Sequence, residues 1–125
     1  MVGGAADDRR DDLMPKRFTL EAHEIKPLAT GRGSCIASDR ITVAGQRVGF
    51  MYREPPRDGI DSGWAFFSGE ETQEYADDPT NFAIHDVNTI ANYDPGIIPH
   101  LDAPTYSAFE RHPDSDHFVP ASFPG

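Results

Sequence analysis

Residues 61–69, with the sequence Asp-Ser-Gly-Trp-Ala-Phe-Phe-Ser-Gly, hold the only tryptophan of the chain and two of its eight phenylalanines. Turn-forming residues close this segment at both ends. Because each aromatic side chain buries about 150–250 Å², Trp64, Phe66 and Phe67 together offer on the order of 10 kcal/mol of gross hydrophobic stabilisation at about 25 cal/mol per Å². We therefore predict that residues 61–69 form the central buried strand of the fold.

The alternation of side chains along this strand places apolar groups on both of its faces. In an extended chain, Trp64 and Phe66 point to one face, whereas Ala65 and Phe67 point to the other. Such a strand is typical of the middle of a sheet with other elements packed above and below it. We expect Trp64 to be buried.

Shorter apolar or alternating runs predict the rest of the sheet. Bounded by turn residues, they lie at residues 18–22, 34–38, 48–53, 81–86 and 105–111. The turn-like sequence around Gly45 favours a hairpin between 34–38 and 48–53. The predicted fold class is α+β: a single domain with a twisted antiparallel sheet of five to six strands and two short helices packed on one side.

Capping residues predict the helices. Ser68 is expected to cap a short helix that ends before Pro79. Asp86 or Asn88 is expected to cap a second helix that runs through residue 92. Ile97, Ile98 and Leu101 then have the spacing of one or two further helical turns.

Composition limits the classes of ligand. The chain of 125 residues has 21 acidic and 11 basic residues and a formal net charge of −10, which argues against a nucleic-acid ligand because phosphate contacts need clustered Lys and Arg. An acidic surface steers toward basic partners, although it also serves solubility alone. The single cysteine, Cys35, excludes an internal disulfide and is compatible with a reducing cytosol. The sequence contains no long apolar run of the kind that marks a membrane segment or an export signal. We therefore expect a cytoplasmic protein.

Several blocks of the sequence, in one order, closely resemble the immunity protein 33 domain, a family also catalogued as a domain of unknown function (2185). The resemblance runs from about Cys35 to Arg111 and is carried by residues 48–54, 61–64, 66–69, 86–90, 94–99 and 108–111. It predicts a domain at 17–111, which leaves residues 1–16 as a disordered leader and 112–125 as an irregular C-terminal tail.

The resemblance implies a bacterial, non-enzymatic binding protein. Members of the family are assigned, largely from their gene neighbourhoods, as immunity proteins that neutralise a cognate toxin of a contact-dependent or polymorphic toxin system. The partner it implies is thus a protein toxin. It supplies no catalytic residue, cofactor or metal ligand, and we expect none. A housekeeping protein-interaction module is an alternative that the sequence does not separate from immunity, and the oligomeric state stays open.

Fast, tight association favours charged complementarity around a few aromatic anchors. The acidic stretch after the central strand meets both needs, and its candidate contact residues are Glu70, Glu71, Glu74, Tyr75, Asp77 and Asp78. The alternative is a solvated surface turn. The loop at residues 54–58 is a second candidate interface.

The alternative from another class is a small-molecule-binding domain or a hydrolase-like enzyme that uses His85 beside Asp86. No Gly-x-Ser-x-Gly elbow accompanies this pair. Residues 112–117 offer nitrogen and oxygen ligands for a metal ion, but in a proline-interrupted stretch. A magnesium cluster of Asp58, Asp61, Glu70 and Glu71 is also conceivable, although nothing in the sequence fixes their mutual distances.

Overall fold

The structure is a computed structural model that describes residues 16–125. The predicted leader, residues 1–16, therefore lies outside the described residues except for Lys16. The Nζ of Lys16 lies 2.9 Å from a carboxylate oxygen of Asp39 and donates to the backbone oxygen of Phe82 at 2.9 Å.

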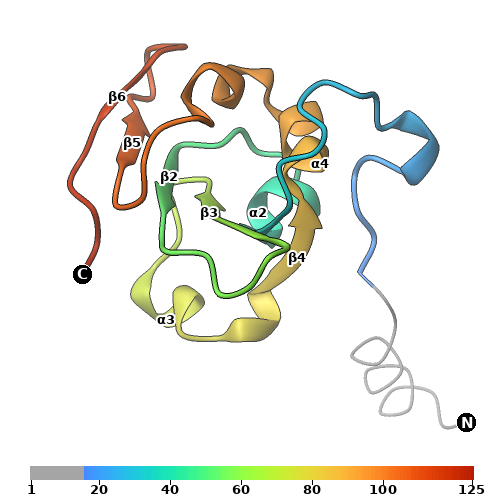
Figure 1. Cartoon of the computed structure of the whole chain (residues 1–125). Coiled ribbons are helices and arrows are strands. Elements are labelled where there is room, and N and C mark those ends of the chain that lie inside the picture. Colours follow the sequence, from blue (N-terminus) through green and yellow to red (C-terminus); the bar gives the residue numbers. More distant parts are fainter. Residues whose placement is uncertain (1–15) are drawn as a thin grey trace, which may run out of the picture.

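Six strands form a single sheet, as predicted (Figure 1). In chain order they are β1 (Ser34–Ser38), β2 (Phe50–Arg53), β3 (Asp61–Phe67), β4 (Phe82–Asp86), β5 (Ala108–Arg111) and β6 (Phe118–Pro120). Their order across the sheet is β4-β1-β3-β2-β5-β6, so β3 has two strands on one side and three on the other. The α+β class and the central position of the tryptophan strand are confirmed.

The sheet is mixed, not purely antiparallel, and the predicted hairpin between the first two strands is wrong. β1 pairs with β3 in parallel and with β4 in antiparallel orientation, whereas β2 pairs with β3 and β5. The physical reason is a helix, α2 (Asp39–Thr42), which starts directly after β1 with Ser38 as its N-cap. Because Ile41 of α2 is fully buried, the chain leaves the sheet at this point and does not turn back beside β1.

Short helices complete the fold. They are α3 (Gln73–Ala76), α4 (Val87–Tyr93) and the 3-10 helices η1 (Ala22–Glu24), η2 (Pro79–Asn81) and η3 (Pro95–His100). Asp86 caps α4 as predicted, by accepting a hydrogen bond from the Asn88 N–H at 2.8 Å. Figure 1 shows α4 beside β4 at one side of the sheet, with β5 and β6 at the other side.

Two local predictions are corrected. Thr72, not Ser68, caps α3, and its hydroxyl accepts from the Tyr75 N–H at 3.1 Å. Residues 18–22 form no strand; the chain enters η1 there, because Glu21 and Glu24 make a capping box that favours a helical turn.

The core is built around Trp64, whose side chain is 2% exposed. Its indole Nε1–H donates to the Leu101 backbone oxygen at 3.2 Å, and the ring stacks on Phe66 at a centroid distance of 6.0 Å. Buried apolar residues from α2, α4 and η3 join the same cluster, among them Ile41, Val87, Ile90 and Ile97. The apolar face of these three helices thus covers the face of the sheet that carries Trp64.

A buried ion pair links η3 to β5. The Arg111 guanidinium donates to both carboxylate oxygens of Asp94, at 2.6 and 3.2 Å, and the two side chains are only 4% and 7% exposed. Asp94 also accepts from the backbone N–H groups of Val48 and Gly96, both at 3.0 Å. One carboxylate therefore holds three segments of the chain together.

The C-terminal residues 112–125 are not wholly irregular. β6 lies within them and pairs with β5 in antiparallel orientation. Phe118 is 8% exposed and belongs to the core, and the Arg111 guanidinium carbon lies 4.3 Å from the centroid of its ring. Burial of this aromatic ring explains why the sheet extends beyond residue 111.

Candidate functional site

The face of the sheet turned away from Trp64, which we call the outer face, carries a continuous apolar row. The strand register aligns Ile84, Ile36, Ala65 and Tyr52 as direct neighbours across β4, β1, β3 and β2. Ala65 is 4% exposed. Its small side chain lies between larger ones, so the surface of the row is hollowed at Ala65.

Aromatic rings extend this row. The Phe67 ring stacks on Tyr52 at 5.6 Å and meets Phe82 edge-on at 5.7 Å. Phe50 lies 6.1 Å from Phe67, and Phe123 packs edge-on against Tyr52 at 5.5 Å. These rings are half-buried, so they pack against one another and still offer apolar surface.

The outer face contains an open groove, which we call the outer groove. Its sheet residues are Ile36, Tyr52, Ala65, Phe67, Phe82, Ala83 and Ile84, and Ala76, Asp77 and Pro79 of the α3–η2 segment also line it. The Ile84 side chain is 71% exposed. An isoleucine that projects so far from a strand leaves apolar surface open to a partner.

The predicted acidic segment runs alongside this groove. Glu70, Glu74, Asp77 and Asp78 are all exposed. Asp77 lines the outer groove. Asp78 caps η2, and hydrogen bonds from the Thr80 hydroxyl and N–H lower the pKa of its carboxyl. The segment presents free negative charge next to an apolar surface.

Glu71 has a structural role within this segment. Its carboxylate accepts from the Ser68 N–H at 2.8 Å, the Ser68 hydroxyl at 3.0 Å and the Gly69 N–H at 2.9 Å. Burial disfavours its charged form, but the hydrogen bonds that the carboxylate accepts outweigh burial and hold the pKa of Glu71 below its ordinary value. Glu71 therefore fixes the turn after β3.

Tyr75 fastens the acidic segment to the sheet. Its ring meets Phe82 edge-on at 5.9 Å, and the Arg40 guanidinium carbon lies 4.9 Å from the ring centroid. The hydroxyl donates to the Asn81 backbone oxygen at 3.4 Å. These contacts leave the ring half-buried, so Tyr75 supports the segment with one part of its ring and offers the rest as surface.

The second predicted interface, residues 54–58, is exposed along its whole length. Glu54 lines the outer groove. Its position is fixed by its N–H, which donates to the Gly63 backbone oxygen at 2.9 Å. Gly63 has a φ of +87°, and a Cβ there would lie 2.0 Å from the Glu54 backbone oxygen. The close approach of these two strands thus requires glycine.

A comparison with models of protein families identifies the family of this chain. A family model described as the Immunity protein Imm33 domain matches residues 35–121. The chain belongs to this family. The matched part of the Imm33 domain runs from the second residue of β1 to just beyond β6, so it covers more than the predicted 35–111 and takes in the outer groove. No curated protein and no solved structure matches the chain.

The His85–Asp86 pair is not assembled in the Imm33 domain. His85 and Asp86 are consecutive residues of β4, so their side chains lie on opposite faces of the strand. His85 pairs with Cys35 of β1, whereas Asp86 caps α4. Phe18 packs edge-on against the His85 ring at 5.0 Å, and burial lowers the pKa of this imidazole. The outer groove is lined by neither residue.

The metal ligands considered from sequence do not converge either. Asp58 and Asp61 lie at the start of β3, whereas Glu70 and Glu71 follow its end. Asp116, in the 112–117 stretch, forms an exposed ion pair with Arg47 at 2.7 Å.

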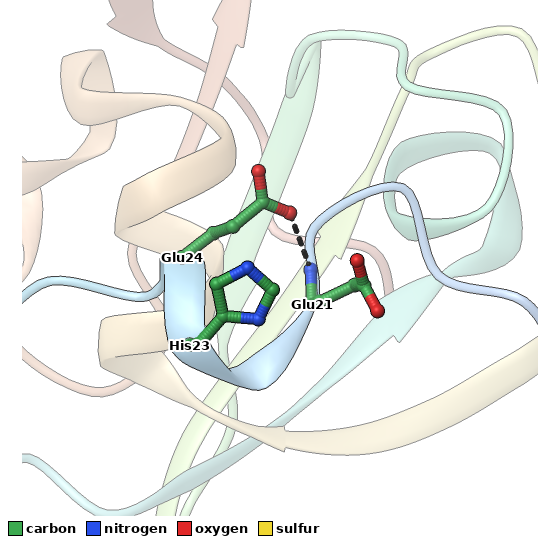
Figure 2. A group of neighbouring side chains, drawn as sticks. All are labelled: Glu21, His23 and Glu24. Carbon is green, nitrogen blue, oxygen red and sulfur yellow. Dashed lines mark hydrogen bonds between the residues drawn. The ribbon is translucent and has the colours of Figure 1, made fainter.

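Within residues 16–125, the one group of three ligand-type side chains close enough for a metal ion is Glu21, His23 and Glu24. All three are exposed, and Figure 2 shows the Glu24 carboxylate accepting from the Glu21 N–H, at 2.9 Å. The capping box of η1 explains this cluster without an ion.

A further depression lies at the ends of β2, β3 and β5. It contains charges of both signs, including Arg47, Glu70, Glu71 and Glu110.

Helices of the described part of the Imm33 domain lack the combination of length and hydropathy that crossing a membrane requires.

Sequence reasoning found the acidic residues but missed the apolar ones beside them. Ile36 and Ile84 lie in strands far apart in sequence, and only the register brings them together. A signal was nevertheless present, because Phe67 and Ala65 gave the central strand a second apolar face. That face is the floor of the outer groove.

Proposed function

We propose that this Imm33 domain is a non-enzymatic immunity protein that binds and neutralises a cognate protein toxin in the bacterial cytoplasm. The observation that carries the proposal is the family match over residues 35–121. Burial raises the pKa of the Cys35 thiol, and the side chain is 1% exposed. A reducing compartment suits such a lone, buried thiol.

The surface supports binding to a protein more than binding to a metabolite. The outer groove is open and mainly apolar, and the His85–Asp86 pair of the enzymatic alternative is divided between two faces. Small-molecule sites are concave and carry a few convergent polar groups. We place the toxin contact at the acidic segment formed by Glu70, Glu71, Glu74, Tyr75, Asp77 and Asp78.

Co-expression with the product of each gene that neighbours this chain's own gene tests the proposal. We expect the domain to restore growth of cells that express the toxin and to form a complex with the toxin by size exclusion. The control is the same toxin expressed with an unrelated acidic domain of similar size. Continued killing, with no complex between the purified proteins, would contradict the function.

The acidic segment is expected to act mainly on the rate of association. Replacing Glu70, Glu74 and Asp77 together with lysine reverses three exposed charges. The backbone N–H of Asp77, which caps the C-terminal end of α3, is kept, and the hydrogen bond from the Gln73 side-chain amide to the Asp77 carboxylate is lost. We expect the association rate constant at low salt to fall about tenfold or more, with a smaller change in dissociation. Stopped-flow or biosensor kinetics at two salt concentrations measure this, since salt screens exposed charges.

A matched control for charge reversal is Asp114→Lys. Asp114 is also exposed but lies in the β5–β6 connection, away from the acidic segment. The loss of association rate is divided by the number of charges reversed in each variant. If this value is the same for the single and the triple variant, net charge alone steers the toxin and the segment is not the contact.

A further inference from the structure

The two faces of the sheet are covered unequally. Buried residues of α2, α4 and η3 pack on the face that carries Trp64. On the outer face, the α3–η2 segment covers only one side of the apolar row. Ile84 stays 71% exposed, and Phe67 and Tyr52 stay half-buried. The outer groove is thus apolar surface that contacts within the described residues leave open.

The charges around the groove indicate the chemistry of its occupant. Among residues 16–125, Glu54 and Asp77 are the charged residues that line it, and both are acidic. Lysine, arginine and histidine are absent from its lining in this part of the chain. Asp86, which is exposed, lies two residues from Ile84 on the same face of β4. The surface therefore matches an apolar side chain with basic residues on either side of it.

The same charges disfavour a second copy of this chain as the occupant. A symmetric dimer through the groove would bring Glu54 and Asp77 of one protomer close to those of the other, in a chain of net charge −10. Like charges placed opposite one another across an interface are costly. A partner with the opposite charge avoids this repulsion.

We propose that the outer groove is the anchor site of the toxin contact: it takes an aliphatic or aromatic side chain of the toxin, flanked by lysine or arginine residues that pair with Glu54 and Asp77. This inference rests on the proposed function, and it moves the centre of the contact from the acidic segment to the groove beside it. The acidic residues steer the toxin, and the apolar row of Ile84, Ile36, Ala65 and Tyr52 holds it.

The test is the substitution Ile84→Asp, with Ile60→Asp as its matched control. Ile84 and Ile60 are 71% and 72% exposed, so neither substitution removes core packing, and Ile60 does not line the groove. The probe is the toxin that the co-expression experiment identifies, purified in an inactivated form. We expect Ile84→Asp to weaken its binding about tenfold or more, and Ile60→Asp to change it less than about twofold. Calorimetric titration measures both, after circular dichroism confirms that each variant is folded.

A second variant tests the rim. Glu54→Lys combined with Asp77→Lys is expected to weaken toxin binding about tenfold or more, with the loss growing as salt is lowered. Equal toxin binding by Ile84→Asp and the unmodified chain would overturn the groove proposal while leaving the immunity function intact. No binding by the unmodified chain would overturn both. Sedimentation of the free protein completes the test, since a dimer that Ile84→Asp dissociates would assign the groove to a second copy.

Discussion

Replacing Arg111 with methionine is expected to destabilise the domain by about 3–5 kcal/mol, because it leaves the buried Asp94 carboxylate without its counter-charge. The two side chains are 4% and 7% exposed, so water does not replace the lost guanidinium. Asp94 keeps its hydrogen bonds from Val48 and Gly96, which compensate a full charge only in part. Since domains of this size are stable by about 5–15 kcal/mol, the loss is a substantial fraction of the total stability. Urea denaturation followed by circular dichroism measures the loss.

Arg47→Met is the matched control. Arg47 contacts Asp116 at 2.7 Å, almost the same distance as the 2.6 Å between Arg111 and Asp94. The exposed fractions are 51% and 88%, however, and an exposed pair contributes about 0–1 kcal/mol. The difference between the variants therefore isolates burial as the cause. Similar losses of stability in both would show that the Arg111–Asp94 pair is hydrated in solution.

Trp64→Ala is expected to cost about 3–5 kcal/mol, the range observed when a fully packed aromatic side chain is removed from a core. The ring packs against Phe66 and Phe109, and the Arg53 guanidinium carbon lies 5.7 Å from its centroid. Removal also leaves the Leu101 backbone oxygen without the indole donor. Denaturation must be followed by circular dichroism, since the variant has no tryptophan to report by fluorescence.

Trp64→Phe and Ile60→Ala bracket this effect. Phenylalanine keeps most of the apolar volume but loses the hydrogen bond to Leu101, so an intermediate loss is expected. Ile60 is 72% exposed, and its truncation should change stability by less than about 0.5 kcal/mol. A loss below about 1 kcal/mol in Trp64→Ala would mean that the sheet is not organised around this side chain.

Most strands of the fold were readable from local pattern, whereas α2, β6 and the order of the strands were not. Aromatic density around Trp64 identified the central strand, and residues 34–38 form β1 as predicted. The expected hairpin is absent because a short helix, α2, stands between β1 and the turn-like sequence near Gly45. The buried side chain of Ile41 holds this helix in the core. Parallel pairing of β1 with β3 is a tertiary choice that no local signal marks.

The candidate site divides in the same way. Composition marked Glu70, Glu74 and Asp77 because charge is visible residue by residue. The groove depends on which residues of different strands become neighbours, as Ile36 and Ile84 do. The supporting role of Tyr75 was hidden for a related reason, since its contacts with Phe82 and Arg40 exist only in the folded chain.

The position of β1 between β3 and β4 has a consequence for how fast the molecule matures. Ile36 finds its neighbours at positions 65 and 84, so the middle of the sheet closes only after long stretches of chain have met. The entropy cost of closing these long loops arises before the stabilising contacts form, which slows folding relative to helical bundles of equal stability. If the domain acts as an antidote, a cell is protected by copies that finished folding before the poison arrived.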